Sequence, residues 1–508
     1  MSRQSLANDS VNIDFYRFNI FHGANLQVFS YFCTMTRQII HILTGNILYI
    51  VSIAASFLLF PGASIWPTAI ALIGVWGMIA CIYKLSGATN LCGWWTLLLS
   101  ATYLAVGIIA NVNHYTSIVS SDTYIPYLQN PDSAIYYFDA MHTYDGTTGS
   151  EAPAHRHGYG MLIAALWHLT GQTIVSPLIV NMVFILLSII ASGIIARRII
   201  SAHISKDRNW ITSCAMTMTA AVCYYLNSGT LLLKEAGICF AMAACVLGAT
   251  LLISQPSNKA KTILLWAGLI IGLALLIFLR HSYILFVAIA IIIMTPWQRK
   301  KIVPALSMLL LCAAAWGITQ LLMHDYEITR QTANIINGNG VANSYFYNHP
   351  QHATYNNMVG DYFSYTVAQR LLWLPISIIT QFLTPFPWNF GRDLIYGYTL
   401  DYAHITYPWY AIGAMVLFYI IWASRKSPKS LLRITLAGII LWCIPAYLFA
   451  GTVSRYALPM LPLLVPAAVY VLAQFNQKRS FHIYCGIYAI VLCVTLIVCY
   501  NLQHLGMQ

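Results

Sequence analysis

The sequence predicts an all-α protein that crosses a membrane many times, and three observations indicate this class. Apolar residues make up 59% of the 508 residues, and charged residues only 8%, whereas about 25% of an ordinary soluble chain is charged. Apolar runs of about 20 residues recur along the whole length, and each could cross a bilayer core of about 30 Å as a helix. Polar and charged residues gather between these runs. We therefore expect a polytopic helical membrane protein.

Taken in order, the apolar runs predict about thirteen spanning helices. These are residues 39–60, 65–84, 92–110, 174–195, 210–225, 231–253, 262–279, 284–296, 301–323, 409–422, 434–449, 458–473 and 483–500. Two shorter apolar runs, 158–170 and 371–383, predict helices that lie at the membrane surface. Residues 1–38 are expected to be a cytoplasmic segment. Residues 39–508 form one predicted membrane domain, because no internal repeat or low-complexity linker divides them.

The charges are distributed unequally between the two faces of this topology. One face carries nineteen Lys and Arg with three acids, and the other carries seven basic residues with eleven acids. The positive-inside rule therefore places the basic face and the N-terminus in the cytoplasm and the two largest loops outside. The net charge of +12 is accounted for by contact with anionic lipid. It does not indicate nucleic-acid binding, since no base-reading motif is present.

The first outer loop, residues 111–171, is the stretch around which the predicted function is organised. It holds five of the fourteen acids. These are Asp122, Asp132, Asp139, Asp145 and Glu151. Residues 132–140 are compatible with a helix that brings Asp132, Tyr136 and Asp139 onto overlapping faces. A Gly-rich turn and a His-Arg-His cluster follow, so the loop predicts a base beside an anion site. The alternative is that these acids only solvate the loop.

The outer face also carries seven basic residues that could bind a phosphate group. These are Arg156, Lys234, Arg280, Arg330, Arg370, Arg392 and Arg455. Lys234-Glu235 opens a helix, Arg280-His281 lies at a turn, and Arg455-Tyr456 precedes a Pro-containing helix. Cationic donors at such positions suit a phosphate group. The alternative is that they extend toward water at helix ends or pair with acids.

The second outer loop, residues 324–407, is rich in aromatic and amide side chains that suit sugar rings, although an interfacial aromatic belt would have the same composition. Four outer histidines, at 155, 157, 349 and 352, match no firm metal-binding spacing. No cofactor is therefore predicted, and a divalent metal is left open. The outer loops contain no cysteine, so no disulfide is expected.

The first loop also carries a family resemblance. The pattern of Asp132-Ser, Tyr136, Ala140 and Gly146, followed by Ala154-His-Arg-His-Gly-Tyr-Gly-Met-Leu-Ile and ending at Leu-Thr-Gly171, resembles bacterial glycosyltransferases of the GT-C type that use lipid-linked sugars. These are related to the protein O-mannosyltransferase and aminoarabinose-transferase group. The chain departs from them at His157-Gly158 and Gly160, where the family often has prolines. It also lacks a pair of adjacent acids at Asp122 and Asp132.

The resemblance implies an inverting glycosyltransferase in a bacterial inner membrane, with its active site on the periplasmic or outer face. It would move a sugar from a polyprenyl-phosphate donor to a glycan or lipid-glycan acceptor. Because phosphate leaves readily, one carboxylate that deprotonates the acceptor suffices. Asp132 and Asp122 are the candidates for that base. The candidate substrate-binding residues are His155, Arg156, His157, Lys234, Glu235, Arg280, His281, Arg392, Arg455 and Tyr456.

Two other functions stay open at this stage. A polysaccharide polymerase or ligase of the O-antigen type would instead rely on Arg and His in the second outer loop. A transporter or lipid flippase would show charged residues inside the spans and two similar halves. The sequence has neither feature, so this last function is the least favoured of the three.

Overall fold

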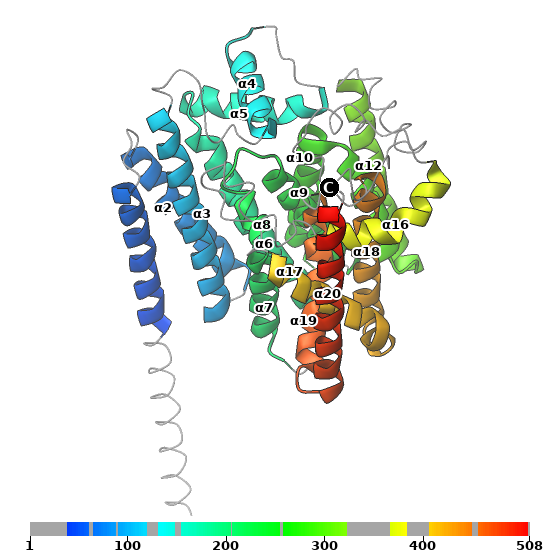
Figure 1. Ribbon diagram of the computed structural model, residues 1–508. Coiled ribbons are helices and arrows are strands. Elements are labelled where there is room, and N and C mark those ends of the chain that lie inside the picture. Colours follow the sequence, from blue (N-terminus) through cyan, green and yellow to red (C-terminus); the bar gives the residue numbers. More distant parts are fainter. Residues whose placement is uncertain are drawn as a thin grey trace, which may run out of the picture. The chain divides into compact units, whose positions relative to one another are not determined.

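The structure is a computed structural model that describes residues 38–59, 65–87, 90–118, 131–147, 154–204, 206–254, 258–322, 366–383, 406–449 and 456–505. Across these ranges the regular structure is helical throughout, with no strand. The chain divides into two units, Met1–Ala55 and Ser56–Gln508. The helix Gln38–Leu59 begins in the first unit. Everything described below belongs to the second unit, whose helices are labelled in Figure 1.

Ten of the described helices are long and apolar enough to cross a membrane, which confirms a multi-pass α-helical membrane protein. Besides Gln38–Leu59 they are α2 (Ile65–Leu85), α3 (Leu91–Ile118), α6 (Val175–Ile200), α9 (Glu235–Ile253), α10 (Lys259–Arg280), α12 (Arg299–Leu322), α18 (Lys429–Phe449), α19 (Leu461–Phe475, preceded by the 3-10 turn Leu458–Met460) and α20 (Arg479–Leu505). Each coincides with one of the predicted spans.

The other three predicted spans are also helical, but shorter. They are α7 (Arg208–Ala221), α11 (Ser282–Met294) and α17 (Thr406–Phe418). Helix α17 continues through the π-helical turn Tyr419–Ala423 and the 3-10 turn Ser424–Lys426. Helices α7 and α11 are shorter than a full span, and α17 reaches that length only together with these two turns, so the count of thirteen stays a prediction.

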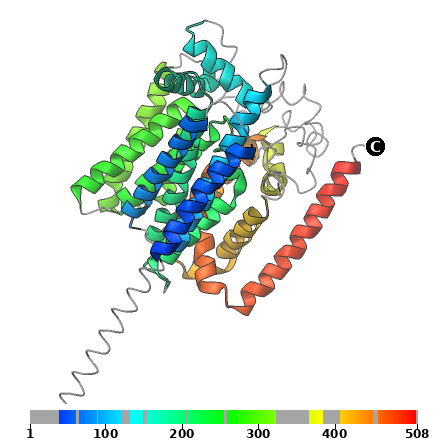
Figure 2. The ribbon, with the colours of Figure 1, turned by 90° about the vertical axis from the view of Figure 1, so that its left-hand side faces the viewer.

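Helices α6, α9 and α19 form the interior of the second unit. About two thirds or more of their most apolar stretch is buried, as expected for helices that are apolar on all sides. Small residues let α9 and α10 approach closely: a Cβ at Gly272 would lie 3.0 Å from the Ala241 carbonyl oxygen. By contrast, α20 lies at the edge of the unit (Figure 2) and buries little of its surface. Its exposed Ile and Val side chains suit contact with lipid.

The basic residues of the second unit gather at one end of its long helices. Near the C-terminus of α6, Arg197 donates hydrogen bonds to the carbonyl oxygens of Ser86 and Gly87 in the turn between α2 and α3, at 3.3 and 3.2 Å. Near the C-terminus of α19, the Tyr470 hydroxyl lies 3.5 Å from the carbonyl oxygen of Lys426. These contacts join helix ends that the charge distribution had assigned to a single face.

Short helices lie at the opposite end. They are α4 (Pro131–Tyr144) and α5 (Ala154–Thr170), the latter running across the ends of the long helices (Figures 1 and 2). Both were predicted to be helical, and both begin earlier than predicted. A third predicted short helix is α16 (Val367–Leu383), which opens with a reciprocal cap between Thr366 and Gln369. In α16 the Arg370 side chain is fully buried, so it packs within the protein and does not extend into water.

Candidate functional site

A buried polar segment connects α7 to α9 and forms the base of the candidate site. It contains α8 (Cys223–Asn227) and a turn that ends at Lys234 and Glu235. Both of these charged side chains are only 4% exposed. Burying an ionisable group in a membrane protein is costly, so such residues mark functional sites unless they serve packing alone. The Lys234-Glu235 pair is therefore the first feature that any proposed function must use.

Asn181, in α6, holds this segment in place. Its Nδ2 atom donates to the carbonyl oxygens of Leu231 and Leu233, at 2.9 and 3.1 Å, and to the Tyr159 hydroxyl of α5, at 2.9 Å. Asn181 is 1% exposed. One amide thus joins a spanning helix, the turn before Lys234 and the short helix α5. This arrangement fixes the position of Lys234 relative to the first outer loop.

Helix α4 packs on α5 through aromatic rings. The ring centroids of Tyr136 and Tyr159 lie 5.1 Å apart, edge to face. The Lys234 ammonium lies 5.4 Å from the centroid of the Tyr136 ring, a distance typical of a cation–π contact. Burial raises the pKa of the Tyr159 phenol; the hydrogen bond from Asn181 lowers it, and the nearby Glu235 carboxylate raises it. The phenol therefore stays protonated.

Two glycines of α5 allow its neighbours to approach. A Cβ at Gly158 would overlap the backbone carbonyl of Phe278 near the end of α10, and a Cβ at Gly160 would overlap the Asp139 carboxylate of α4. Asp139 is 2% exposed. Both positions are among those at which the chain departs from the resembled family. Their physical role here is close packing, because only glycine leaves room for the α10 backbone and for a buried carboxylate.

A second cation completes the site at the turn between α10 and α11. The Arg280 guanidinium carbon lies 4.1 Å from the centroid of the Tyr456 ring and 5.9 Å from that of Tyr283. The Tyr283 hydroxyl donates to the Tyr456 carbonyl oxygen at 2.8 Å, which fixes the ring beneath the guanidinium. Arg280 also interacts electrostatically with Glu235. Arg280 is thereby connected to the residue that follows Lys234 in the chain.

We call these residues the polar end cluster. It consists of Tyr136, Asp139, Tyr159, Asn181, Lys234, Glu235, Arg280, Tyr283 and Tyr456. It gathers two cations, two carboxylates and four phenols at the end of the unit where α4 and α5 lie. Chemically, such a set can bind an anion through cations and hydroxyls and can orient a polar ligand over aromatic faces.

The predicted site residues fall into three groups. The structure brings Lys234, Glu235, Arg280 and Tyr456 together, as expected for one site. His281 lies at the same turn, but its ring packs 5.9 Å from that of Trp316 in α12. The remaining predicted residues belong to stretches whose side chains lie outside the described part of the chain.

The positions of that last group can be stated for the backbone alone. Asp132 lies in the first turn of α4, and His155, Arg156 and His157 lie in the first turn of α5. Both turns therefore begin helices that carry members of the polar end cluster. Asp122, Arg392 and Arg455 lie outside the described residues.

The sequence analysis did not select five members of the cluster as site residues, namely Tyr136, Asp139, Tyr159, Asn181 and Tyr283. Asn181 could have been found, because it is a lone amide in an apolar span and polar residues there are usually functional or bonded between helices. Asp139 was one of five loop acids, and its predicted place on a helix face with Asp132 gave it no role of its own. Tyr159 sits in a helix with other aromatic residues, and only the packing of α4 on α5 distinguishes it.

Among the described residues, no group of three or more His, Cys, Asp or Glu side chains could hold a metal ion. No protein-family model, curated protein or solved structure matches the chain. The case for a function therefore depends on the residues themselves.

Proposed function

We propose that this protein is an inverting glycosyltransferase that uses a sugar linked to a polyprenyl phosphate and acts at the end of the molecule where α4 and α5 lie. One observation carries the proposal: the buried Lys234 contacts Tyr136 of the acid-rich first loop, and Arg280 interacts electrostatically with Glu235, the residue that follows Lys234. A lipid phosphate at the membrane boundary needs such cations. The proposal also rests on the resemblance of residues 132–171 to GT-C enzymes.

The proposed reaction transfers the sugar in one displacement. The acceptor hydroxyl oxygen attacks the anomeric carbon, and the bond between that carbon and the phosphate oxygen breaks. The electron pair stays on the phosphate, and the hydroxyl proton passes to a carboxylate. The configuration inverts because the nucleophile enters opposite the leaving group. A phosphate is a good leaving group, so no acid has to protonate it, and a single base suffices.

Roles follow from these requirements. Lys234 and Arg280 stabilise the charge that develops on the departing phosphate, with Tyr283 and Tyr456 holding the guanidinium of Arg280 in place. Asp132 or Asp122 takes the acceptor proton. Asp139, packed against Gly160, positions α4 on α5 and thereby the turn that bears Asp132.

The test is a transfer assay on the purified full-length protein in proteoliposomes. A panel of radiolabelled polyprenyl-phosphate sugars serves as donor, and glycan or lipid-glycan fractions of a bacterial envelope serve as acceptors. We expect transfer by the wild-type chain and a loss of a hundredfold or more, on the order of a missing general base, for either Asp132→Asn or Asp122→Asn. Full activity in both variants would remove the carboxylate-base mechanism.

Two further measurements separate this function from its competitors. Lys234→Met and Arg280→Met should each lower transfer strongly, whereas Lys206→Met, an exposed lysine at the opposite end, should not. Product analysis should show one added sugar; a ladder of repeats would instead indicate a polymerase. Absence of transfer from every donor, together with movement of labelled lipid across the vesicle membrane, would overturn the enzyme assignment.

A further inference from the structure

A pocket at the opposite end of the second unit is lined by four basic side chains. They come from separate elements: Arg198 from α6, Lys301 from α12, and Lys429 and Arg433 from α18. The cavity measures about 310 Å³, which is within the size range of small-molecule sites. None of the described residues that line it is acidic, so this described lining carries a net positive charge. The pocket is independent of the polar end cluster.

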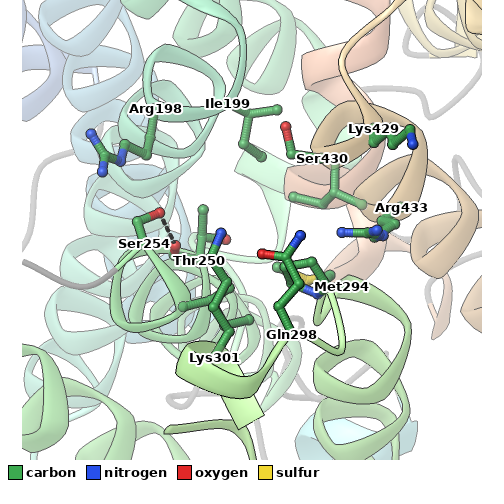
Figure 3. A pocket seen from close by; sticks show the side chains of 13 residues that line it. Arg198, Ile199, Thr250, Ser254, Met294, Gln298, Lys301, Lys429, Ser430 and Arg433 are labelled. Atoms are coloured by element: carbon green, nitrogen blue, oxygen red, sulfur yellow. Dashed lines mark hydrogen bonds between the residues drawn. The ribbon is translucent and has the colours of Figure 1, made fainter.

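The side chains are arranged around a common centre. Figure 3 shows the guanidinium of Arg433 and the carboxamide of Gln298 pointing toward the middle of the pocket, with Arg198 and Lys429 on opposite sides. Arg433 and Lys301 are partly buried, whereas Arg198 and Lys429 are exposed. The exposed cations attract an anion from solvent. The partly buried cations then bind it more strongly, because water screens the attraction between opposite charges less at a buried position.

Two helix N-termini add to the positive potential. Helix α12 begins at Arg299 and α18 begins at Lys429, and each contributes residues of its first turns to the lining. The first amide N–H groups of a helix have no partner within it, and the macrodipole is positive there, so such ends bind phosphate and sulfate. The C-terminal end of α9 also borders the pocket. There the Ser254 hydroxyl donates a hydrogen bond to the Thr250 carbonyl oxygen of the same helix, at 2.8 Å.

The ordinary explanation of basic residues at this end is membrane orientation. Residues with that role alone spread over the surface and extend toward water or lipid headgroups. Other basic residues of this end fit that description, because Lys206, Lys261 and Arg479 are exposed and lie outside the pocket. The four lining residues differ because three distant parts of the chain bring them around one cavity.

We propose that this pocket binds a phosphate or diphosphate group, carried either by the headgroup of an anionic lipid or by a free anion. Guanidinium and ammonium groups with amide donors match phosphate oxygens, and Arg433 can engage two oxygens at once. More than one negative charge is expected on the ligand, since four cations from three helices line the pocket and no acid is among its described lining residues. The site would let the protein sense or retain a phosphate-bearing molecule at its basic end.

The test uses the full chain in nanodiscs and two probes. In the first arm, pyrophosphate is titrated onto protein in phosphatidylcholine nanodiscs, and binding is measured by calorimetry. In the second arm, the unfolding temperature is compared between phosphatidylcholine nanodiscs and discs that also contain phosphatidic acid. Binding in the first arm alone identifies a free anion as the ligand. Stabilisation in the second arm alone identifies a lipid headgroup.

Matched variants make the result specific. Lys301→Gln and Arg433→Gln should each weaken binding about tenfold, the usual effect of losing one charge-assisted contact. The controls are Lys261→Gln, which like Lys301 is the third residue of its helix, and Arg479→Gln, and both should bind as the wild type does. Unfolding of each variant without ligand checks that it is folded. Equal binding by pocket and control variants, or no response in either arm, overturns the proposal.

Discussion

The hydrogen bonds of Asn181 predict a measurable and specific loss of stability. The amide has two protons and three acceptors, namely Tyr159, Leu231 and Leu233, at 2.9, 2.9 and 3.1 Å. Hydrogen bonds between helices in membrane proteins contribute about 0.6 kcal/mol each on average and about 1.7 at most. Two donated protons therefore correspond to about 1–3 kcal/mol. Asn181→Leu removes the donors and keeps the side-chain volume, so it should lower the free energy of unfolding by this amount.

The assay is unfolding of the purified protein by SDS in mixed micelles, followed by tryptophan fluorescence. Ser188→Ala is the control in the same helix, because the Ser188 hydroxyl donates to the Ile185 carbonyl oxygen three residues earlier, and such local bonds add little. A double-mutant cycle with Tyr159→Phe should give a coupling of about 0.6 kcal/mol. If Asn181→Leu unfolds like Ser188→Ala and the coupling is zero, Asn181 does not hold the turn before Lys234, and the reasoning fails.

Two other changes test the packing of the site. Gly158→Ala should separate α5 from the α10 backbone and lower the unfolding temperature by several degrees, as expected for overpacking of about 1–3 kcal/mol, whereas Gly268→Ala, in open space on α10, should have no such effect; equal shifts would show that the close approach is unimportant. Arg280→Lys keeps the charge but loses the planar stack on Tyr456, so transfer should fall although the variant stays folded; unchanged transfer would mean that charge alone matters there.

The sequence predicted the architecture well because hydrophobic periodicity is a local property. Every apolar run became a helix, and both short first-loop helices were found. The three shorter helices show the limit. Helix α7 is rich in Ser and Thr, and α11 and α17 have only 13 residues each, so local hydropathy identifies them as helical segments without deciding whether they cross the membrane. The sequence of α7 alone does not predict that this helix packs beside α3, α6 and α19.

The candidate site was predictable only in part, and the reason is physical. Lys234, Glu235 and Arg280 were identified because a charge beside an apolar run is conspicuous. Their convergence depends on how α9, α10 and the 222–235 segment pack, which no local pattern encodes. Asp139 was indistinguishable from neighbouring acids until its contact with Gly160 set it apart. Charge composition thus indicates candidate residues, whereas helix packing decides which of them meet.

The polar groups within the described spans bear on whether the protein could be a transporter, and two hydroxyl pairs join helices there: Ser192 with Thr219, and Thr96 with Thr217. A path through the membrane would need polar side chains that face a continuous route between the two ends. The buried hydroxyls of Ser188, Thr219, Thr250 and Thr319 instead donate to carbonyl oxygens of their own helices three or four residues earlier. A hydroxyl that already donates its proton within its own helix is not available to donate to a transported substrate. These local bonds do not form a continuous polar route, and the polar end cluster and the basic pocket lie at different ends of the second unit.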